Sequence, residues 1–152
     1  MNYDDTLKMA DNLGLVVREK PLKSSDGRIY NNRVAIRRTI PTSVEKSCVL
    51  AEEIGHYRTG YGDITRLKSV SDRKQEYRAR LYGYNLKIGL MGLIRAYKHG
   101  CHSLYEAAEY LDVTEEYLKE AIDCYKSKYG EYVEIDNYVI CFYPYLAVLE
   151  FK

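Results

Sequence analysis

Apolar and polar residues follow two different periods along the chain, and these periods predict its elements. Residues 3–13 carry an apolar stripe at helical spacing, made by Leu7, Met9, Ala10 and Leu13, and Gly14 is a typical helix stop. Residues 15–17, 28–30 and 33–37 instead favour short strands, because their branched and alternating residues stand between turn signals. The sequence therefore predicts a helix followed by a small antiparallel sheet.

Two longer helical segments follow the predicted sheet. Thr42 with Glu45 three residues later forms a capping-box pattern, which predicts a helix that continues through Tyr57 and ends near Gly60. From Ser71 onward an apolar stripe returns at helical spacing, made by Tyr77, Leu81, Tyr84 and Ile88. Three glycines interrupt this region and indicate a bend or a close approach of helices: Gly83, Gly89 and Gly92.

The last third predicts a pair of helices and then strands. Ser103 caps a helix, and the apolar pattern continues across a turn at residues 112–114 as far as Gly130, an arrangement similar to a helix-turn-helix. Strands are expected at residues 132–135, 138–142 and 146–149. The prediction is an α+β fold in a single domain over residues 1–152, with a core at 1–100, the helical pair at 101–130 and C-terminal strands at 131–152.

Composition narrows the classes of function. The chain has 152 residues and a net charge of +1, which is ordinary for a globular protein of one core. No signal peptide and no membrane-spanning run is recognisable, so a cytoplasmic location and no membrane partner are expected. The cysteines show no Cys-x-x-Cys pair, and reduced thiols are expected for all of them: Cys48, Cys101, Cys124 and Cys141.

Charge is unevenly distributed along the chain. Residues 18–38 have a basic surplus, whereas the charged residues of 103–123 are nearly all acidic. Glu115, Glu116 and Glu120 lie on the helix that would be the recognition helix of the helix-turn-helix-like pair, and phosphates would repel them. Direct nucleic-acid binding is therefore not expected.

The candidate chemistry lies in the segment Glu52-Glu53-Ile54-Gly55-His56. Positions i and i+4 share a helix face, so Glu52 and His56 project together, and a carboxylate ligates zinc as imidazole does. The segment differs from His-Glu-x-x-His, in which both histidines bind zinc and the glutamate activates a water, only by Glu52 in the first position. The alternative is an ordinary amphipathic helix on which Glu52, Glu53 and His56 are solvated.

Glu76 also has two possible roles. It stands beside the apolar stripe of the second long helix, where a carboxylate usually pairs with an arginine, and Arg73 and Arg80 are suitably spaced. Alternatively it is a third metal ligand supplied by that helix. A second metal site from His99, His102 and Cys124 is not expected, because these residues have no ligand spacing.

The order of these signals resembles the ImmA/IrrE family of metallo-endopeptidases, the type found in phages and mobile elements. The residues that carry the resemblance are 49–57, where the family has Ala-His-Glu-Leu-Gly-His, and 76–83, where it has Glu-x-x-Ala-Asn-x-Phe-Ala. The resemblance implies a zincin-like α+β fold and cleavage of a protein substrate, plausibly the repressor of such an element. It covers about residues 1–130.

Carried over to this chain, the resemblance implies that Glu52, His56 and Glu76 hold one divalent metal and that Glu53 is the catalytic base. Tyr57, Tyr82 and Tyr84 are candidates for stabilising the oxyanion. Zinc is the expected metal, and Glu52 in place of histidine makes manganese a competitor, because oxygen donors suit harder cations.

Two rival functions remain open. A zincin-like fold that has lost catalysis would act as an antirepressor, docking a basic DNA-binding protein on its acidic helices. Direct DNA binding through the helical pair ranks last because of its charge.

Overall fold

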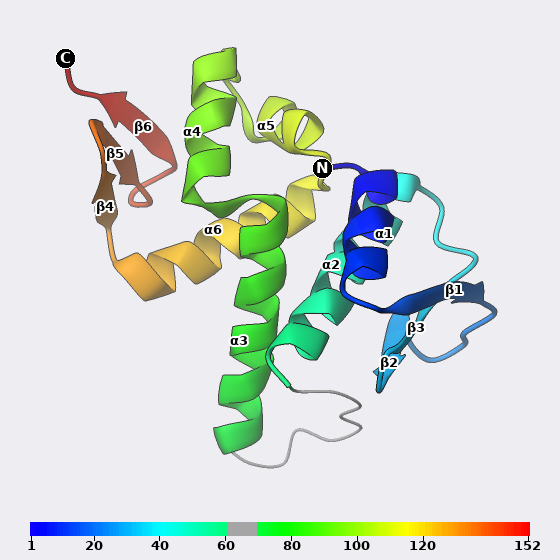
Figure 1. Cartoon of the computed structure of the whole chain (residues 1–152). Helices are drawn as coiled ribbons and strands as arrows, with labels where there is room; N and C mark the ends of the chain where they lie inside the picture. The colour runs from blue at the N-terminus through cyan, green and yellow to red at the C-terminus, as the bar shows by residue number, and fades with distance from the viewer. Residues whose placement is uncertain (61–69) are drawn as a thin grey trace. The chain divides into compact units, whose positions relative to one another are not determined.

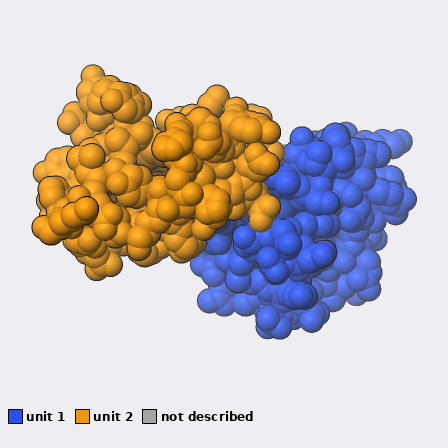
Figure 2. Space-filling view, turned by 90° about the horizontal axis from the view of Figure 1, so that it is seen from above, with its two compact units in different colours: residues 1–87 blue, residues 88–152 orange. Residues whose placement is uncertain are grey.

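A computed structural model of the protein describes residues 1–60 and 70–152, with the side chains of residues 70–72 excepted. Contacts cluster into two compact units, Met1–Lys87 and Ile88–Lys152 (Figures 1 and 2). The first unit contains α1 (Tyr3–Asn12), β1 (Val16–Lys20), β2 (Gly27–Tyr30), β3 (Arg33–Arg37), α2 (Ser43–Arg58) and α3 (Val70–Lys87). The second contains α4 (Gly89–His99), α5 (Leu104–Leu111), α6 (Glu115–Tyr129), β4 (Tyr132–Ile135), β5 (Tyr138–Cys141) and β6 (Ala147–Glu150).

The first sheet has the strand order β1-β3-β2. β2 and β3 form an antiparallel hairpin around Asn31, whose φ of 53° suits the tight turn that the sequence predicts. β1, however, pairs with β3 in parallel, so the prediction of an antiparallel sheet was wrong for this strand. The alternation of side chains fixes which face of a strand is buried, but it carries no information about strand direction.

Helix α2 packs against this sheet and carries the core of the first unit. Thr42 caps it as predicted, its side chain accepting a hydrogen bond from the Glu45 amide. Leu50 and Ile54 are fully buried against Val34 and Ile36 of β3. One face of the sheet is therefore covered by helix, while the side chains of the other face are mostly exposed.

Helices α2 and α3 approach each other unusually closely. A Cβ atom built on Gly55 would stand 2.1 Å from the carbonyl oxygen of Ala79, and one on Gly83 would stand 3.0 Å from the carbonyl oxygen of Ala51. Only glycine fits at position 55, and a side chain at position 83 would be crowded, because the neighbouring atoms belong to rigid backbone. The predicted close packing at Gly83 is thus confirmed, and it decides how near α3 comes to the ligand-bearing face of α2.

A buried polar network ties the start of the chain to the end of α3. Lys87 is 3% exposed and donates hydrogen bonds to the Ser47 hydroxyl, at 2.6 Å, and to the Met1 carbonyl. Ser47 also lies 3.1 Å from the hydroxyl of Thr6 on α1. A buried ammonium is tolerated only with such partners, so this network fixes α1, α2 and α3 to one another.

The second unit combines three helices with an antiparallel meander. β4, β5 and β6 pair in sequence order, confirming the predicted C-terminal strands, and α4 contacts both β5 and β6. The turn between α5 and α6 falls at Asp112, whose φ is 56°, and Gly130 ends α6 as predicted. Tyr125 is fully buried and accepts a hydrogen bond from the Gly89 amide.

The fold is α+β, as the sequence predicts. The division into two units after Lys87 differs from the predicted subdivisions at residues 100 and 130, and the assignment of the whole chain to a single domain stays a prediction. Among the described residues, no helix has the length and apolar character needed to cross a membrane.

Candidate metal centre

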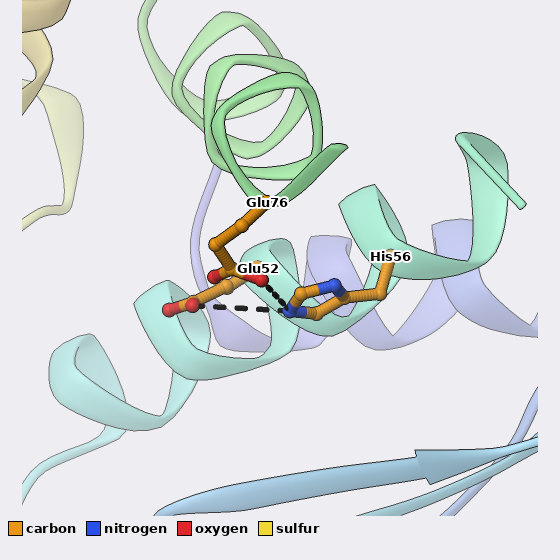
Figure 3. Close-up of side chains that lie close together, drawn as sticks. All are labelled: Glu52, His56 and Glu76. Atoms are coloured by element: carbon orange, nitrogen blue, oxygen red, sulfur yellow. Dashed lines mark ion pairs between the residues drawn. The ribbon is translucent and has the colours of Figure 1, made fainter. Parts of the chain in front are cut away.

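Three of the predicted site residues meet between α2 and α3. Glu52 and His56 stand one turn apart on α2, and Glu76 faces them from α3 (Figure 3). The Nε2 atom of His56 lies 3.9 Å from Oε1 of Glu52 and 3.8 Å from Oε2 of Glu76. His56 and Glu76 are largely buried, whereas the Glu52 side chain is 41% exposed. The cluster therefore opens to solvent on the Glu52 side.

The donor atoms can reach one metal ion after a small rearrangement. One ligand atom from each residue lies within 4.8 Å of the other two. Donors bound tetrahedrally to a cation at about 2.1 Å stand about 3.4 Å apart. The two distances to His56 therefore need to shorten by about 0.4–0.5 Å, and the distance between the two carboxylates by at most about 1.4 Å. The Glu52 side chain is 41% exposed and can supply part of this movement. One imidazole and two carboxylates are also a donor set that binds zinc or a harder divalent ion.

Arg80 is a fourth member of the cluster. Its Nε atom donates a hydrogen bond to Oε1 of Glu76 at 3.1 Å and lies 3.8 Å from Oε1 of Glu52. Partial burial opposes the effect, but these two carboxylates raise the pKa of Arg80 above its ordinary value. The predicted pairing of Glu76 with an arginine is thus confirmed for Arg80. Both predicted roles of Glu76 are sterically compatible, because Arg80 contacts one carboxylate oxygen and His56 approaches the other.

Glu53 is buried beside this cluster, on the sheet side of α2. It is 8% exposed, and its Oε1 atom lies 3.0 Å from where a Cβ of Gly27 would stand on β2. Burial, together with the nearby charges of Glu52 and then Glu76, raises the pKa of Glu53 from 4.5 to about 8. The alternative of an ordinary helix with Glu53 solvated is therefore wrong, since an acidic side chain is held in the interior.

The three candidate tyrosines are placed differently. The hydroxyl of Tyr82 accepts a hydrogen bond from Nε of Arg58 at 3.2 Å, and Tyr57 and Tyr82 pack against the core of the first unit. Tyr84 is buried on α3, 6% exposed. The role of these residues in stabilising an oxyanion stays a prediction.

Two features of the site were not recognised from the sequence. The sequence pattern marks Gly27 only as a turn residue before β2, yet its missing side chain leaves the space that Glu53 fills. The pattern marks Gly55 only as a position between Glu53 and His56, yet the contact with Ala79 depends on it. No local pattern distinguishes these glycines from turn or flexible glycines, because the atoms that make them necessary are distant in sequence.

His99 is the last residue of α4, and His102 follows shortly after the helix ends. His99 stacks on Tyr110, with ring centroids 4.3 Å apart. Among the described residues, the group of possible metal ligands found is Glu52, His56 and Glu76, and it includes neither histidine.

An α+β fold in which two helices bring a histidine and two glutamates together, with a third glutamate buried alongside, is a metallopeptidase-like arrangement. The sequence profile of the IrrE N-terminal-like domain, a peptidase family, matches residues 10–123. The chain belongs to this family, and the matched range includes every residue of the cluster. Comparison with curated proteins and with solved structures finds no significant match.

Proposed function

We propose that the protein is a metal-dependent endopeptidase that acts in the cytoplasm on a protein substrate, plausibly the repressor of a phage or mobile element. The observation that carries this proposal is the convergence of Glu52, His56 and Glu76 within 4.8 Å, with Glu53 buried beside them. Membership of the peptidase family supports it. The repressor as substrate comes from the family resemblance of the two motifs.

Glu52, His56 and Glu76 would hold the metal. A divalent ion in such a set supplies Lewis-acid polarisation of the peptide carbonyl and lowers the pKa of water. Two carboxylates lie beside one histidine here and Arg80 contacts both of them, so a single positive side chain faces two negative ones and a cation can neutralise the remaining charge. Zinc is the proposed ion, and manganese is the competitor that a second carboxylate ligand favours.

Glu53 would act as the general base. Its carboxylate takes a proton from the attacking water and transfers it to the amine of the leaving peptide. Besides burial, repulsion by Glu52 and Glu76 contributes to the high pKa of Glu53. A cation held by these two carboxylates would therefore lower that pKa towards the value that a base needs at neutral pH. A tyrosine hydroxyl from Tyr57, Tyr82 or Tyr84 would stabilise the developing oxyanion.

Metal analysis tests the site directly. The wild-type protein and the Glu52→His variant are purified, equilibrated with zinc or manganese, and analysed for bound ion and for cleavage of candidate repressors. We expect about one ion per chain in both proteins and tighter zinc binding in Glu52→His, which restores the second imidazole. Absence of bound metal in both proteins would remove the peptidase proposal.

The second candidate is an antirepressor that works by binding alone. It is supported by Glu52 in place of histidine and by exposed acidic residues on α5 and α6, among them Glu109, Glu115 and Glu116. A derepression assay of Glu53→Gln separates the candidates, because a binding protein keeps full activity without the base whereas a peptidase loses it.

A further inference from the structure

The face of the first sheet that points away from α2 carries cations around a small apolar centre. The strand register places Arg18 and Arg28 on either side of Ala35 in one row, and Val16 and Tyr30 on either side of Arg33 in the next. The four outer residues and Arg33 are exposed, Tyr30 to 64%. Since Ala35 is short, the long side chains around it enclose a hollow of about 600 Å³.

This hollow is strongly positive. The described residues that line it include four cations and no carboxylate: Arg18, Lys20, Arg28 and Arg33. The nearby carboxylate of Asp26 lies 2.6 Å from a guanidinium nitrogen of Arg37, and that ion pair cancels its charge. A ligand that covers this face must therefore bring negative charge together with some apolar surface.

The hollow is linked to the metal centre by β2. This strand is an edge strand, hydrogen-bonded to β3 alone among the described strands (Figure 1). Gly27 faces α2 and lies against the carboxylate of Glu53, whereas the next residue, Arg28, faces the hollow. A peptide strand added to the free edge of β2 would thus run past Glu53 and display alternate side chains beside Arg28 and Tyr30.

We infer that β2 binds an extended segment of the protein substrate that carries an acidic side chain beside Arg28 and an apolar side chain beside Tyr30, two positions away. The inference rests on the proposed function and specifies its substrate class. Residues opposite each other on paired strands stand about 5 Å apart, which is within reach of a charge-assisted hydrogen bond from arginine. A peptide is favoured over a nucleic acid, because the edge of β2 offers main-chain carbonyls as well as amides, and a phosphodiester backbone has no donor for the carbonyls.

Binding of labelled peptides to the Glu53→Gln protein tests this inference without requiring cleavage. The probes are short peptides of serine and threonine with Asp and Leu two positions apart, and the same peptides with Asn or Lys replacing Asp. Fluorescence anisotropy at low salt is expected to give about tenfold tighter binding for the Asp peptide than for the Asn peptide. High salt should reduce this preference, because the cations are exposed.

Variants assign the effect to the sheet. Introduced into the Glu53→Gln protein, Arg28→Glu should reverse the preference in favour of the Lys peptide. Tyr30→Ser in the same background should weaken binding of the Leu-containing peptides. Arg78→Glu, a charge reversal at an exposed position of α3, is the matched control and should leave the preference unchanged. Methylation of the peptide's main-chain nitrogens should abolish binding, since a strand pairs through them.

The outcomes separate this inference from the proposed function. Equal binding of the Asp, Asn and Lys peptides overturns the inference, and so does oligothymidylate binding more tightly than the Asp peptide. Cleavage of peptides by the metal-loaded wild type without preference for Asp leaves the peptidase proposal standing and removes only the inference. Selective binding of the Asp peptide without any cleavage supports the inference and contradicts the peptidase proposal.

Discussion

At the scale of single residues, the metal centre is defined by competition for two carboxylates. Arg80 lies 3.1 Å from Glu76 and 3.8 Å from Glu52, so a positive charge already stabilises the oxygens that a divalent ion needs. The resembling family often has asparagine at this position, and asparagine provides no such charge. Arg80 should therefore weaken metal binding without blocking it, because it leaves His56 and one oxygen of Glu76 facing each other.

Replacing Arg80 measures this competition. Arg80→Gln keeps a polar side chain of similar length and removes the charge, so we expect about tenfold tighter binding of zinc and manganese. Isothermal titration calorimetry of wild type and variant gives the two dissociation constants. Arg78→Gln, at an exposed position of the same helix, is the control and should match wild type. Weaker metal binding by Arg80→Gln would mean that the arginine supports the site.

The buried carboxyl of Glu53 makes stability depend on pH. Its pKa is raised from 4.5 to about 8, so the folded protein holds this proton more tightly than the unfolded chain does. Stability from this group is fully present below pH about 4.5 and is lost as pH rises to about 8. Metal-free Glu53→Gln should therefore gain stability over wild type as pH increases, by on the order of a few kcal/mol above pH about 8.

Urea unfolding in the presence of a chelator, repeated from acidic to alkaline pH, checks this expectation for Glu53. Glu45→Gln, at a half-buried position in the first turn of α2, provides the control for loss of a glutamate on that helix. A difference between Glu53→Gln and wild type that does not change with pH would contradict the raised pKa.

At the scale of elements, the distance between α2 and α3 determines whether the ligands meet. Glu76 reaches His56 because two glycines, Gly55 and Gly83, let the helix backbones touch. A similar helix pair with larger side chains at these positions would lie about 1–2 Å farther apart. The chemistry of the site therefore depends on residues that have no side chain.

Substituting Gly55 tests the role of this close contact. Gly55→Ala forces a Cβ against the Ala79 carbonyl, and we expect a loss of about 1–3 kcal/mol of stability together with weaker metal binding. Gly92→Ala on α4 is the matched control, because its Cβ would meet only ordinary contacts, the nearest at 3.4 Å. That change should leave metal binding intact and favour the helix by about 0.5–1 kcal/mol. Chemical denaturation and metal titration measure both effects.

The hydrogen-bond network around Lys87 also holds helices of the first unit together. Ser47→Ala removes a partner of the buried ammonium, so unfolding should require about 1–3 kcal/mol less free energy. Ser43→Ala, at the exposed start of the same helix, is the control and should cost much less. Urea denaturation of both variants supplies the comparison, and equal losses would show that the bond to Lys87 contributes little.

At the scale of the whole molecule, charge is segregated between the two units. The outer sheet face of the first unit carries the cations of residues 18–33, and the helices α5 and α6 of the second carry exposed acids. The net charge of +1 does not reflect this separation, because positive and negative residues nearly cancel over the whole chain. Each unit therefore presents a surface suited to partners of opposite charge, although the chain as a whole is nearly neutral.

Reversing charge on α6 tests whether a basic partner docks there. Glu115→Lys combined with Glu116→Lys should slow association with a basic repressor severalfold and reduce the dependence of that rate on salt. Surface plasmon resonance at several ionic strengths measures the association rate. Lys128→Glu, which adds negative charge at an exposed position of the same helix, is the opposing control and should not slow association. Unchanged kinetics in the double variant would remove α5 and α6 as the docking surface.

The sequence determined the elements and the candidate ligands. Helix caps such as Thr42, turn residues such as Asn31 and the spacing of Glu52 and His56 act within a few residues, so local patterns reveal them. Tertiary structure decided the parallel pairing of β1, the burial of Glu53 over Gly27 and the bridge from Arg80 to two carboxylates. These features depend on contacts between segments far apart in the chain, and their energies are set by distance and burial, which periodicity does not encode.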